Sequence, residues 1–233
     1  MTDAFRIDRA DAVAQVTLTR PEVRNALRPA EQHALAAALA SLDSDAGVRL
    51  IVLTGTGTAA FSAGLNLKDR AAVLAELRGE GPSGLGAVLR VAQGIATPIL
   101  GRVNGACVAG GMGLLAACSH AVAVDRAVFA LPEVKVGLYP NVVMAGWAHR
   151  IAPGALDRMA ETGDPMDAAQ ARRMGLIDEI VTDDDLDAAV RQAARRILDG
   201  PPPTPRAIPG FDAALTTAEA RTRAYHRSQI VDS

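Results

Sequence analysis

The stretch that decides the fold reads Asn104-Gly-Ala-Cys-Val-Ala-Gly-Gly-Met-Gly113. It follows an apolar run at 98–103 that predicts a buried β-strand, and its glycines open a helical pattern that reaches Cys118. A second turn, Phe61-Ser-Ala-Gly-Leu-Asn-Leu-Lys-Asp69, also follows a predicted strand and opens a predicted helix. Backbone N–H groups at a helix start are free to bind negative charge, and glycine lets a ligand approach them closely. Both turns are therefore candidates for binding a ligand through the backbone.

A structural interpretation of these turns competes with the functional one, because glycine also lets a helix pack closely on a strand. The 104–113 turn is not a phosphate-binding P-loop, since no Lys-Ser/Thr pair follows its glycines, and its spacing misses the dinucleotide pattern G-x-G-x-x-G. Ser62 lies in no G-x-S-x-G elbow, which argues against a hydrolase triad. Two such turns in one chain weaken the structural interpretation and leave it open.

Strand and helix patterns alternate on both sides of the two turns. This order predicts parallel β-α-β units over about the first 135 residues, followed by a helical tail, in an α/β protein. A Gly/Pro-rich surface loop is expected at 79–86, and Tyr139 and Trp147 are expected in the core. The expected strands are 12–19, 48–54, 98–103, 121–124, 128–131 and 177–181, and the expected helices are 29–42, 69–78, 85–95, 110–118, 142–151, 155–162, 167–174, 184–199 and 212–230.

Composition narrows the class of protein. The chain has 233 residues, of which 49% are apolar and 21% charged, which argues against disorder. A net charge of −2 provides no general field for nucleic acid or an anionic membrane. The N-terminus has no signal-peptide pattern, and Cys107 and Cys118 lie in apolar sequence, so we expect buried thiols in a soluble, cytoplasmic protein. The four histidines lack metal-ligand spacing, so no metal site is expected.

Four motifs, in order and near the right spacing, resemble the signature of the enoyl-CoA hydratase/isomerase (crotonase) family. They are Arg20-Pro-Glu-Val-Arg-Asn-Ala-Leu27, the 61–68 turn, the 104–113 turn and Phe129-Ala-Leu-Pro-Glu-Val-Lys-Val-Gly-Leu-Tyr-Pro140. The resemblance implies a crotonase-like spiral of ββα units with a C-terminal helical region used for trimer contacts. It also implies a core at 1–195, a helical segment at 196–233 that is shorter than the family norm, and a homotrimer or hexamer.

The resemblance further implies an active site that binds an acyl-CoA thioester as substrate, with no bound cofactor. The thioester oxygen would accept hydrogen bonds from the backbone N–H groups of Leu65 and Gly110, which would stabilise an enolate. Glu133 matches a catalytic glutamate of the family, and Pro132 restricts the backbone beside it. A carboxylate in an apolar pocket has a raised pKa, which suits proton transfer to and from carbon.

The same resemblance assigns substrate contacts to Arg24, Ala26, Ala63 and Lys68, on the side of the CoA nucleotide. Each cation could equally be a solvated surface residue. Asn141 lies where family members vary their active-site groups, and it could orient a substrate or act as a helix N-cap.

One departure from the family pattern bears on the reaction. Hydratases of the family carry a second glutamate where this chain has Gly113, and two carboxylates together activate water. A single carboxylate can still move a proton from one carbon to another. The sequence therefore favours enoyl-CoA isomerisation with Glu133 as the acid/base. The alternatives are a hydratase or lyase acting on an unusual acyl-CoA, and a non-catalytic acyl-CoA-binding relative.

Overall fold

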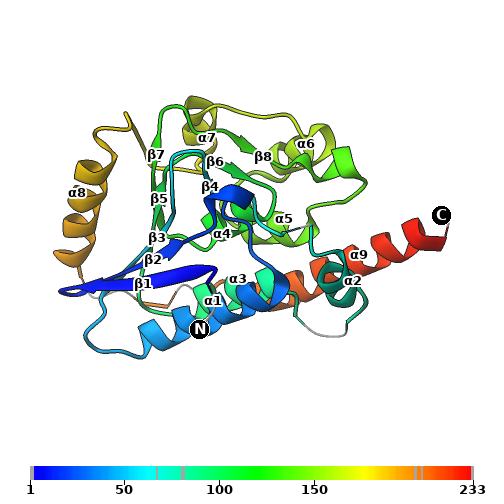
Figure 1. Cartoon of the computed structure of the whole chain (residues 1–233), viewed down its shortest axis with the longest axis horizontal. Helices are drawn as coiled ribbons and strands as arrows, with labels where there is room; N and C mark the ends of the chain where they lie inside the picture. Colours follow the sequence, from blue (N-terminus) through cyan, green and yellow to red (C-terminus); the bar gives the residue numbers. More distant parts are fainter. Residues whose placement is uncertain (1–2, 67, 80–81, 202–203, 206, 232–233) are drawn as a thin grey trace.

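The structure is a computed structural model that describes the whole chain except residues 1–2, 67, 80–81, 202–203, 206 and 232–233 (Figure 1). Its strands are β1 (Phe5–Ala10), β2 (Val13–Leu18), β3 (Leu50–Gly55), β4 (Ala60–Ser62), β5 (Ile99–Val103), β6 (Ala106–Val108), β7 (His120–Val124), β8 (Phe129–Ala130) and β9 (Glu179–Val181). Its helices are α1 (Pro29–Asp43), α2 (Arg70–Arg78), α3 (Gly84–Gly94), α4 (Gly110–Ala116), α5 (Asn141–Trp147), α6 (Pro153–Thr162), α7 (Ala168–Met174), α8 (Leu186–Leu198) and α9 (Phe211–Val231), with short 3-10 helices η1 (Pro21–Val23) and η2 (Pro132–Val136).

The strands form two sheets. A six-stranded sheet has the order β1-β2-β3-β5-β7-β9, and a three-stranded sheet has the order β4-β6-β8. All pairs are parallel except β1 with β2. Along the chain, β3-β4, β5-β6 and β7-β8 each place one strand in each sheet and then lead into a helix. These repeated ββα units confirm the crotonase-like spiral.

Three strands were missing from the sequence expectation. β1 is an edge strand whose residues after Phe5 are exposed, so its charged side chains gave no buried alternation. β4 and β6 have three residues each and lie within the two glycine turns, which had been expected as turns only. The expectation of β-α-β units was therefore too simple, because the crossovers from β3 to β5, from β5 to β7 and from β7 to β9 each contain a second short strand. The expected surface loop at 79–86 was wrong from Gly84 onward, where α3 begins; residues 80–81 lie outside the described part.

Small side chains hold the helices close together around α4. Every residue of α4 is buried, and α4 packs against α3, α5 and the strands β4 and β6. A Cβ atom on Gly146 of α5 would lie 3.1 Å from the Cβ of Ala116, which shows how closely the two backbones approach. This explains how a chain with only 3% aromatic residues fills its core. Trp147 is fully buried, as expected, and so are the free thiols of Cys107 and Cys118.

The C-terminal helix α9 lies across the helical side of the molecule. In Figure 1 it runs beneath α3 and α5 and passes α2 on its way to the C-terminus. It contacts α5, α2 and α3. Residues late in the chain are thereby brought beside the segment that follows the first glycine turn. The division into a core at 1–195 and a segment at 196–233 stays a prediction.

Candidate functional site

A cavity of about 1160 Å³ opens between the two glycine turns, η2, α2, α3, α5 and α9. Its walls carry mostly apolar side chains, with charged groups at several points. Of the residues predicted for the site, Arg24, Ala26, Ala63, Leu65, Lys68, Gly110 and Glu133 all line this cavity. The structure therefore brings together residues that are distant in the sequence.

The first turn is fixed by hydrogen bonds to the segment before α1. Leu27 N–H donates to the carbonyl of Gly64 (2.7 Å), and Ala63 N–H donates to the carbonyl of Arg24 (2.9 Å). The hydroxyl of Ser62 donates to the carbonyl of Asn25 (3.0 Å) and accepts from the N–H of Gly64 (3.0 Å). Residues 24–27 and 62–65 are thus held side by side. This anchoring fixes the direction of the backbone at Leu65.

The amide of Asn25 is a structural clamp that the sequence did not reveal. Its side chain is buried, and its Nδ2 donates to the carbonyls of Ala60 (2.8 Å) and Thr56 (3.1 Å). Arg24 and Asn25 both have positive φ values, 54° and 56°. This left-handed pair turns the chain sharply beside the cavity, and the buried amide compensates for part of its strain.

The second turn approaches the first with almost no space between the backbones. Gly64 has φ +78°, and a Cβ atom there would lie 2.3 Å from the Cα of Gly110. A Cβ on Gly111 would lie 2.1 Å from the carbonyl oxygen of Ser62. Just before α4, Ala109 has φ 51° and ψ −129°, an unfavourable conformation for a residue with a side chain, and its N–H donates to the carbonyl of Ala130 (3.0 Å). Only glycine at positions 64 and 111 permits this approach.

The backbone N–H groups of Leu65 and Gly110 are unusual among the described residues that line the cavity. Within the described part of the chain, neither donates to a protein acceptor, although the neighbouring Asn66 N–H donates to the carbonyl of Leu27 (2.9 Å). A Cβ built on Gly110 would lie only 3.2 Å from the nitrogen of Leu65, so the two residues are adjacent in space. Two neighbouring free donors in a cavity can bind one oxygen atom that carries negative charge.

Glu133 lies on η2, directly after Pro132, at the wall of the same cavity. Burial raises the pKa of Glu133 to about 7, and a hydrogen bond from its own backbone N–H opposes this effect. Its Oε2 is buried and has no hydrogen-bond partner in the described part of the chain. A carboxyl group in this state can gain or lose a proton near neutral pH.

The remaining predicted residues differ in their placement. Arg24 and Lys68 are exposed at the cavity, and the backbone N–H of Lys68 donates to Oδ1 of Asn66 (3.1 Å). Asn141 is the first residue of α5 rather than its N-cap, which is Pro140, and it makes no capping hydrogen bond. The N-cap interpretation was therefore wrong, because α5 begins one residue earlier than expected. Asn141 is also absent from the described residues that line the cavity.

Several cavity residues were missed or misplaced at the sequence level. Tyr139, expected in the core, is partly buried and lines the cavity. Leu85 of α3 fills the space beside Gly113, since a Cβ at Gly113 would lie 2.6 Å from its Cδ2. Glu76 of α2 and Glu219 of α9 also line the cavity. No local pattern marks these residues, because helices from different parts of the chain bring them there.

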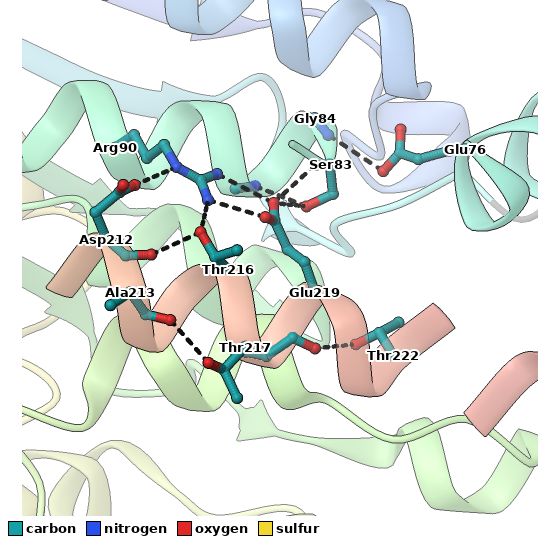
Figure 2. A network of polar contacts seen from close by, with 12 residues as sticks. Glu76, Ser83, Gly84, Arg90, Asp212, Ala213, Thr216, Thr217, Glu219 and Thr222 are labelled. Carbon is teal, nitrogen blue, oxygen red and sulfur yellow. Dashed lines mark hydrogen bonds and ion pairs between the residues drawn. The ribbon is translucent and has the colours of Figure 1, made fainter. Parts of the chain in front are cut away.

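A polar network joins α9 to the start of α3 (Figure 2). Arg90 donates from Nη2 to Oε2 of Glu219 (2.9 Å) and pairs with Asp212. Oε1 of Glu219 accepts from both the backbone N–H (2.7 Å) and the hydroxyl (3.1 Å) of Ser83. Glu219 is 3% exposed. Its buried carboxylate is paired with the Arg90 guanidinium and accepts hydrogen bonds from Ser83, which compensates for its burial. One wall of the cavity is thereby fixed to α9.

Two further findings concern the described residues as a set. They contain no group of three or more His, Cys, Asp or Glu side chains arranged to hold a metal ion. Among the helices they form, none combines the length and the apolar character that crossing a membrane requires.

Comparisons with known proteins agree with the geometry. The family model described as "Enoyl-CoA hydratase/isomerase" matches residues 8–231. A carnitinyl-CoA dehydratase of Salmonella arizonae is 31% identical over 203 residues, which cover 87% of this chain and 77% of that protein. The structure of a carnitinyl-CoA dehydratase from Mycobacterium avium superposes with a TM-score of 0.82, at 28% identity, and covers 98% of this chain and 94% of that one. The structure of a probable enoyl-CoA hydratase from Mycobacterium smegmatis gives a TM-score of 0.83, at 28% identity, with coverage of 98% and 97%. The chain therefore belongs to the enoyl-CoA hydratase/isomerase family, whose members act on CoA thioesters.

Proposed function

We propose that this protein binds an acyl-CoA with its thioester oxygen between the N–H groups of Leu65 and Gly110, and that Glu133 moves protons on the acyl chain. The observation that carries the proposal is the meeting of three unused groups in one cavity. Among the residues that the structure describes, two backbone donors have no acceptor and one carboxylate oxygen has no partner. Such an arrangement has all the groups needed to form and discharge an enolate.

The reaction that needs no further group is isomerisation of a 3-enoyl-CoA to a 2-enoyl-CoA. The Glu133 carboxylate removes a proton from C2, and the electron pair moves onto the thioester oxygen. The same carboxyl group returns the proton to C4 as the double bond moves to C2–C3. No atom is gained or lost. The pKa of about 7 places Glu133 between its two required protonation states near neutral pH. Each backbone donor contributes on the order of 3 kcal/mol to lowering the barrier.

The exposed cations Arg24 and Lys68 are proposed to bind the phosphates of the CoA nucleotide. Ala26 and Ala63 present backbone beside them in the same wall of the cavity. The CoA thioester is the substrate in this proposal, and no resident cofactor is required. Asn141, one position before the cavity-lining Val142, is left without a proposed contact.

Hydration or dehydration is the second candidate reaction. The similar proteins are named carnitinyl-CoA dehydratase and enoyl-CoA hydratase, and this favours a reaction that adds or removes water. Such a reaction needs a group that holds the water, and Gly113 has no side chain to do so. A cytoplasmic homotrimer or hexamer is proposed as the working form, on the basis of the family resemblance.

The test is product analysis after incubation with a medium-chain 3-enoyl-CoA. We expect the wild type to form the 2-enoyl-CoA and the Glu133→Gln variant to lose this activity by at least about 10²-fold. Asp184→Asn is the matched control, because it also replaces a carboxylate by an amide but lies exposed between β9 and α8. If Glu133→Gln isomerises as fast as the wild type, the proposed role of Glu133 is wrong. Binding without turnover by the wild type would favour a non-catalytic acyl-CoA-binding protein.

A further inference from the structure

Two buried carboxylate oxygens in the described part of the chain have no hydrogen-bond partner, and both belong to the same cavity. One is Oε2 of Glu133, and the other is Oε2 of Glu76. Glu219, another buried glutamate that lines the cavity, has both of its oxygens engaged by Arg90 and Ser83. A buried carboxylate oxygen without a partner is unfavourable unless a ligand supplies the donor. Glu76 therefore resembles Glu133 rather than the structural Glu219.

The position of Glu76 is fixed from one side only. Its Oε1 accepts a hydrogen bond from the backbone N–H of Gly84 (3.2 Å), while Oε2 has no donor among the described residues (Figure 2). Burial raises the pKa of Glu76, and the hydrogen bond from Gly84 opposes this effect; to a smaller extent, His33 also lowers the pKa and Glu219 raises it. Gly84 is held in turn because the preceding Ser83 is bound by Glu219. The network from α9 thus orients Glu76 through the start of α3.

Glu76 also lies on the side of the cavity next to Gly113, the position where hydratases of the family carry a second glutamate. The residue after Gly84 is Leu85, whose Cδ2 would be 2.6 Å from a Cβ atom at Gly113. The carboxylate of Glu76 is therefore bound to the backbone one residue away from the side chain that covers Gly113. Leu85 and Glu76 both line this side of the cavity, so an apolar side chain and a carboxylate lie next to each other there.

We propose that Glu76 is the second carboxylate of the active site, and that its Oε2 accepts a hydrogen bond from the hydroxyl group on C3 of a 3-hydroxyacyl thioester or from the water that becomes this hydroxyl. The inference rests on the proposed function, since it assumes that the acyl group occupies this cavity. It assigns to α2 a role that position 113 cannot perform in this chain. It also makes hydration and dehydration available beside isomerisation.

Hydration of a 2-enoyl thioester would use both carboxylates. The Glu76 carboxylate takes one proton from water as the water oxygen bonds to C3 of a 2-enoyl thioester. The C2–C3 electron pair then forms the enolate, and the carboxylic acid of Glu133 gives its proton to C2. The product gains one H and one OH. The proton on Glu76 returns to Glu133 through water, which restores both groups without another reactant.

The test compares wild type, Glu76→Gln and the exposed control Asp184→Asn in two reactions. Gln keeps an oxygen at Oε1 for the N–H of Gly84, so the fold is expected to be retained, which the fluorescence of the single Trp147 would verify. With a 2-enoyl-CoA, we expect Glu76→Gln to lose hydration by about 10²-fold, as for removal of a general acid/base. With a 3-enoyl-CoA, we expect a much smaller loss of isomerisation than of hydration, because Glu133 is intact.

A binding measurement separates the hydroxyl contact from turnover. The probes are a 3-hydroxyacyl-CoA and the saturated acyl-CoA of equal chain length, measured by calorimetry. Glu76→Gln should weaken only the hydroxylated ligand, by about tenfold, the size of one hydrogen bond to a charged group. The inference would be overturned if the wild type and Glu76→Gln bound the 3-hydroxyacyl-CoA with equal affinity, or if Glu76→Gln hydrated the 2-enoyl-CoA as fast as the wild type. If Glu133→Gln removes isomerisation while Glu76→Gln changes neither hydration nor binding, the proposed function stands and the role of Glu76 fails. If the wild type catalyses neither reaction and binds neither ligand, the proposed function fails, and with it the inference.

Discussion

Replacing Glu133 by Gln should make the protein more stable at pH 8 while it removes activity. The pKa of Glu133 is about 7 in the folded protein, against an ordinary value of 4.5, because burial disfavours the ionised carboxylate. Below pH 4.5 both the folded and the unfolded chain hold the proton, so the group has no effect on the free energy of unfolding. As the pH rises toward 7, the unfolded chain loses this proton before the folded one does. Stability therefore falls with rising pH across this window.

The magnitude follows from the pKa difference. One pKa unit corresponds to about 1.4 kcal/mol, so full ionisation of Glu133 costs the folded state about 3 kcal/mol at most, and the greater part develops between pH 5 and pH 8. Gln is neutral at every pH and removes this contribution. The gap in the free energy of unfolding between Glu133→Gln and the wild type should therefore widen by about 2 kcal/mol from pH 5 to pH 8.

Urea unfolding, followed by the fluorescence of the buried Trp147 at one protein concentration, measures this gap. A fixed concentration is needed because assembly would otherwise shift the apparent stability. The free energy of unfolding of Asp184→Asn should equal that of the wild type at both pH values, since the carboxylate that it replaces is exposed. A gap of the same size at pH 5 and pH 8 would refute the claim that a buried, ionisable Glu133 is held at a cost to stability.

Three other predictions follow from the packing. Gly64→Ala should lower kcat by at least about 10²-fold, because its Cβ would lie 2.3 Å from the Cα of Gly110 and force the two donors apart; near-normal turnover would contradict this. Arg90→Met should reduce the free energy of unfolding by about 3 kcal/mol, because it leaves the buried Glu219 without its cation. The double variant Arg90→Met/Glu219→Gln should regain part of this stability. If the losses of the two single variants simply add, the ion pair is not the cause. Ala109→Gly should raise the free energy of unfolding by about 1 kcal/mol by relieving a φ of 51°, and a lower urea midpoint would mean that the conformation is not strained.

Much of the fold could be predicted from hydrophobic patterns. β3 is a continuous run of largely apolar residues rich in β-branched side chains, and α1 is an Ala- and Leu-rich segment that begins with Pro29, so both could be recognised from the sequence. β4 and β6 could not be found in this way, because three residues show no period and each strand lies beside glycines. The start of α5 was predicted one residue too late for a related reason, since helix boundaries depend on local geometry rather than on composition. Asn141 is therefore the first helical residue and not the N-cap.

The candidate site divides along similar lines. Leu65, Gly110 and Glu133 lie in motifs that can be read directly from the sequence, and the cavity contains all three. Glu76 could not be identified, because what makes its carboxylate unusual is an oxygen left unpartnered after Gly84 binds the other one. Glu219 binds Ser83 across 136 residues of sequence, a distance over which no pattern in a single chain reports contact.

The dependence of the cavity on α9 has a consequence for how the protein is made. Residues that line the cavity come from as early as Glu22 and from as late as Arg223. Synthesis proceeds from the N-terminus, so a nascent chain can form both glycine turns while the wall that contains Glu219 has not yet been translated. The cavity is therefore completed only when the last helix docks. Until then the side of the cavity that Glu219, Thr222 and Arg223 line stays open in a growing chain on the ribosome.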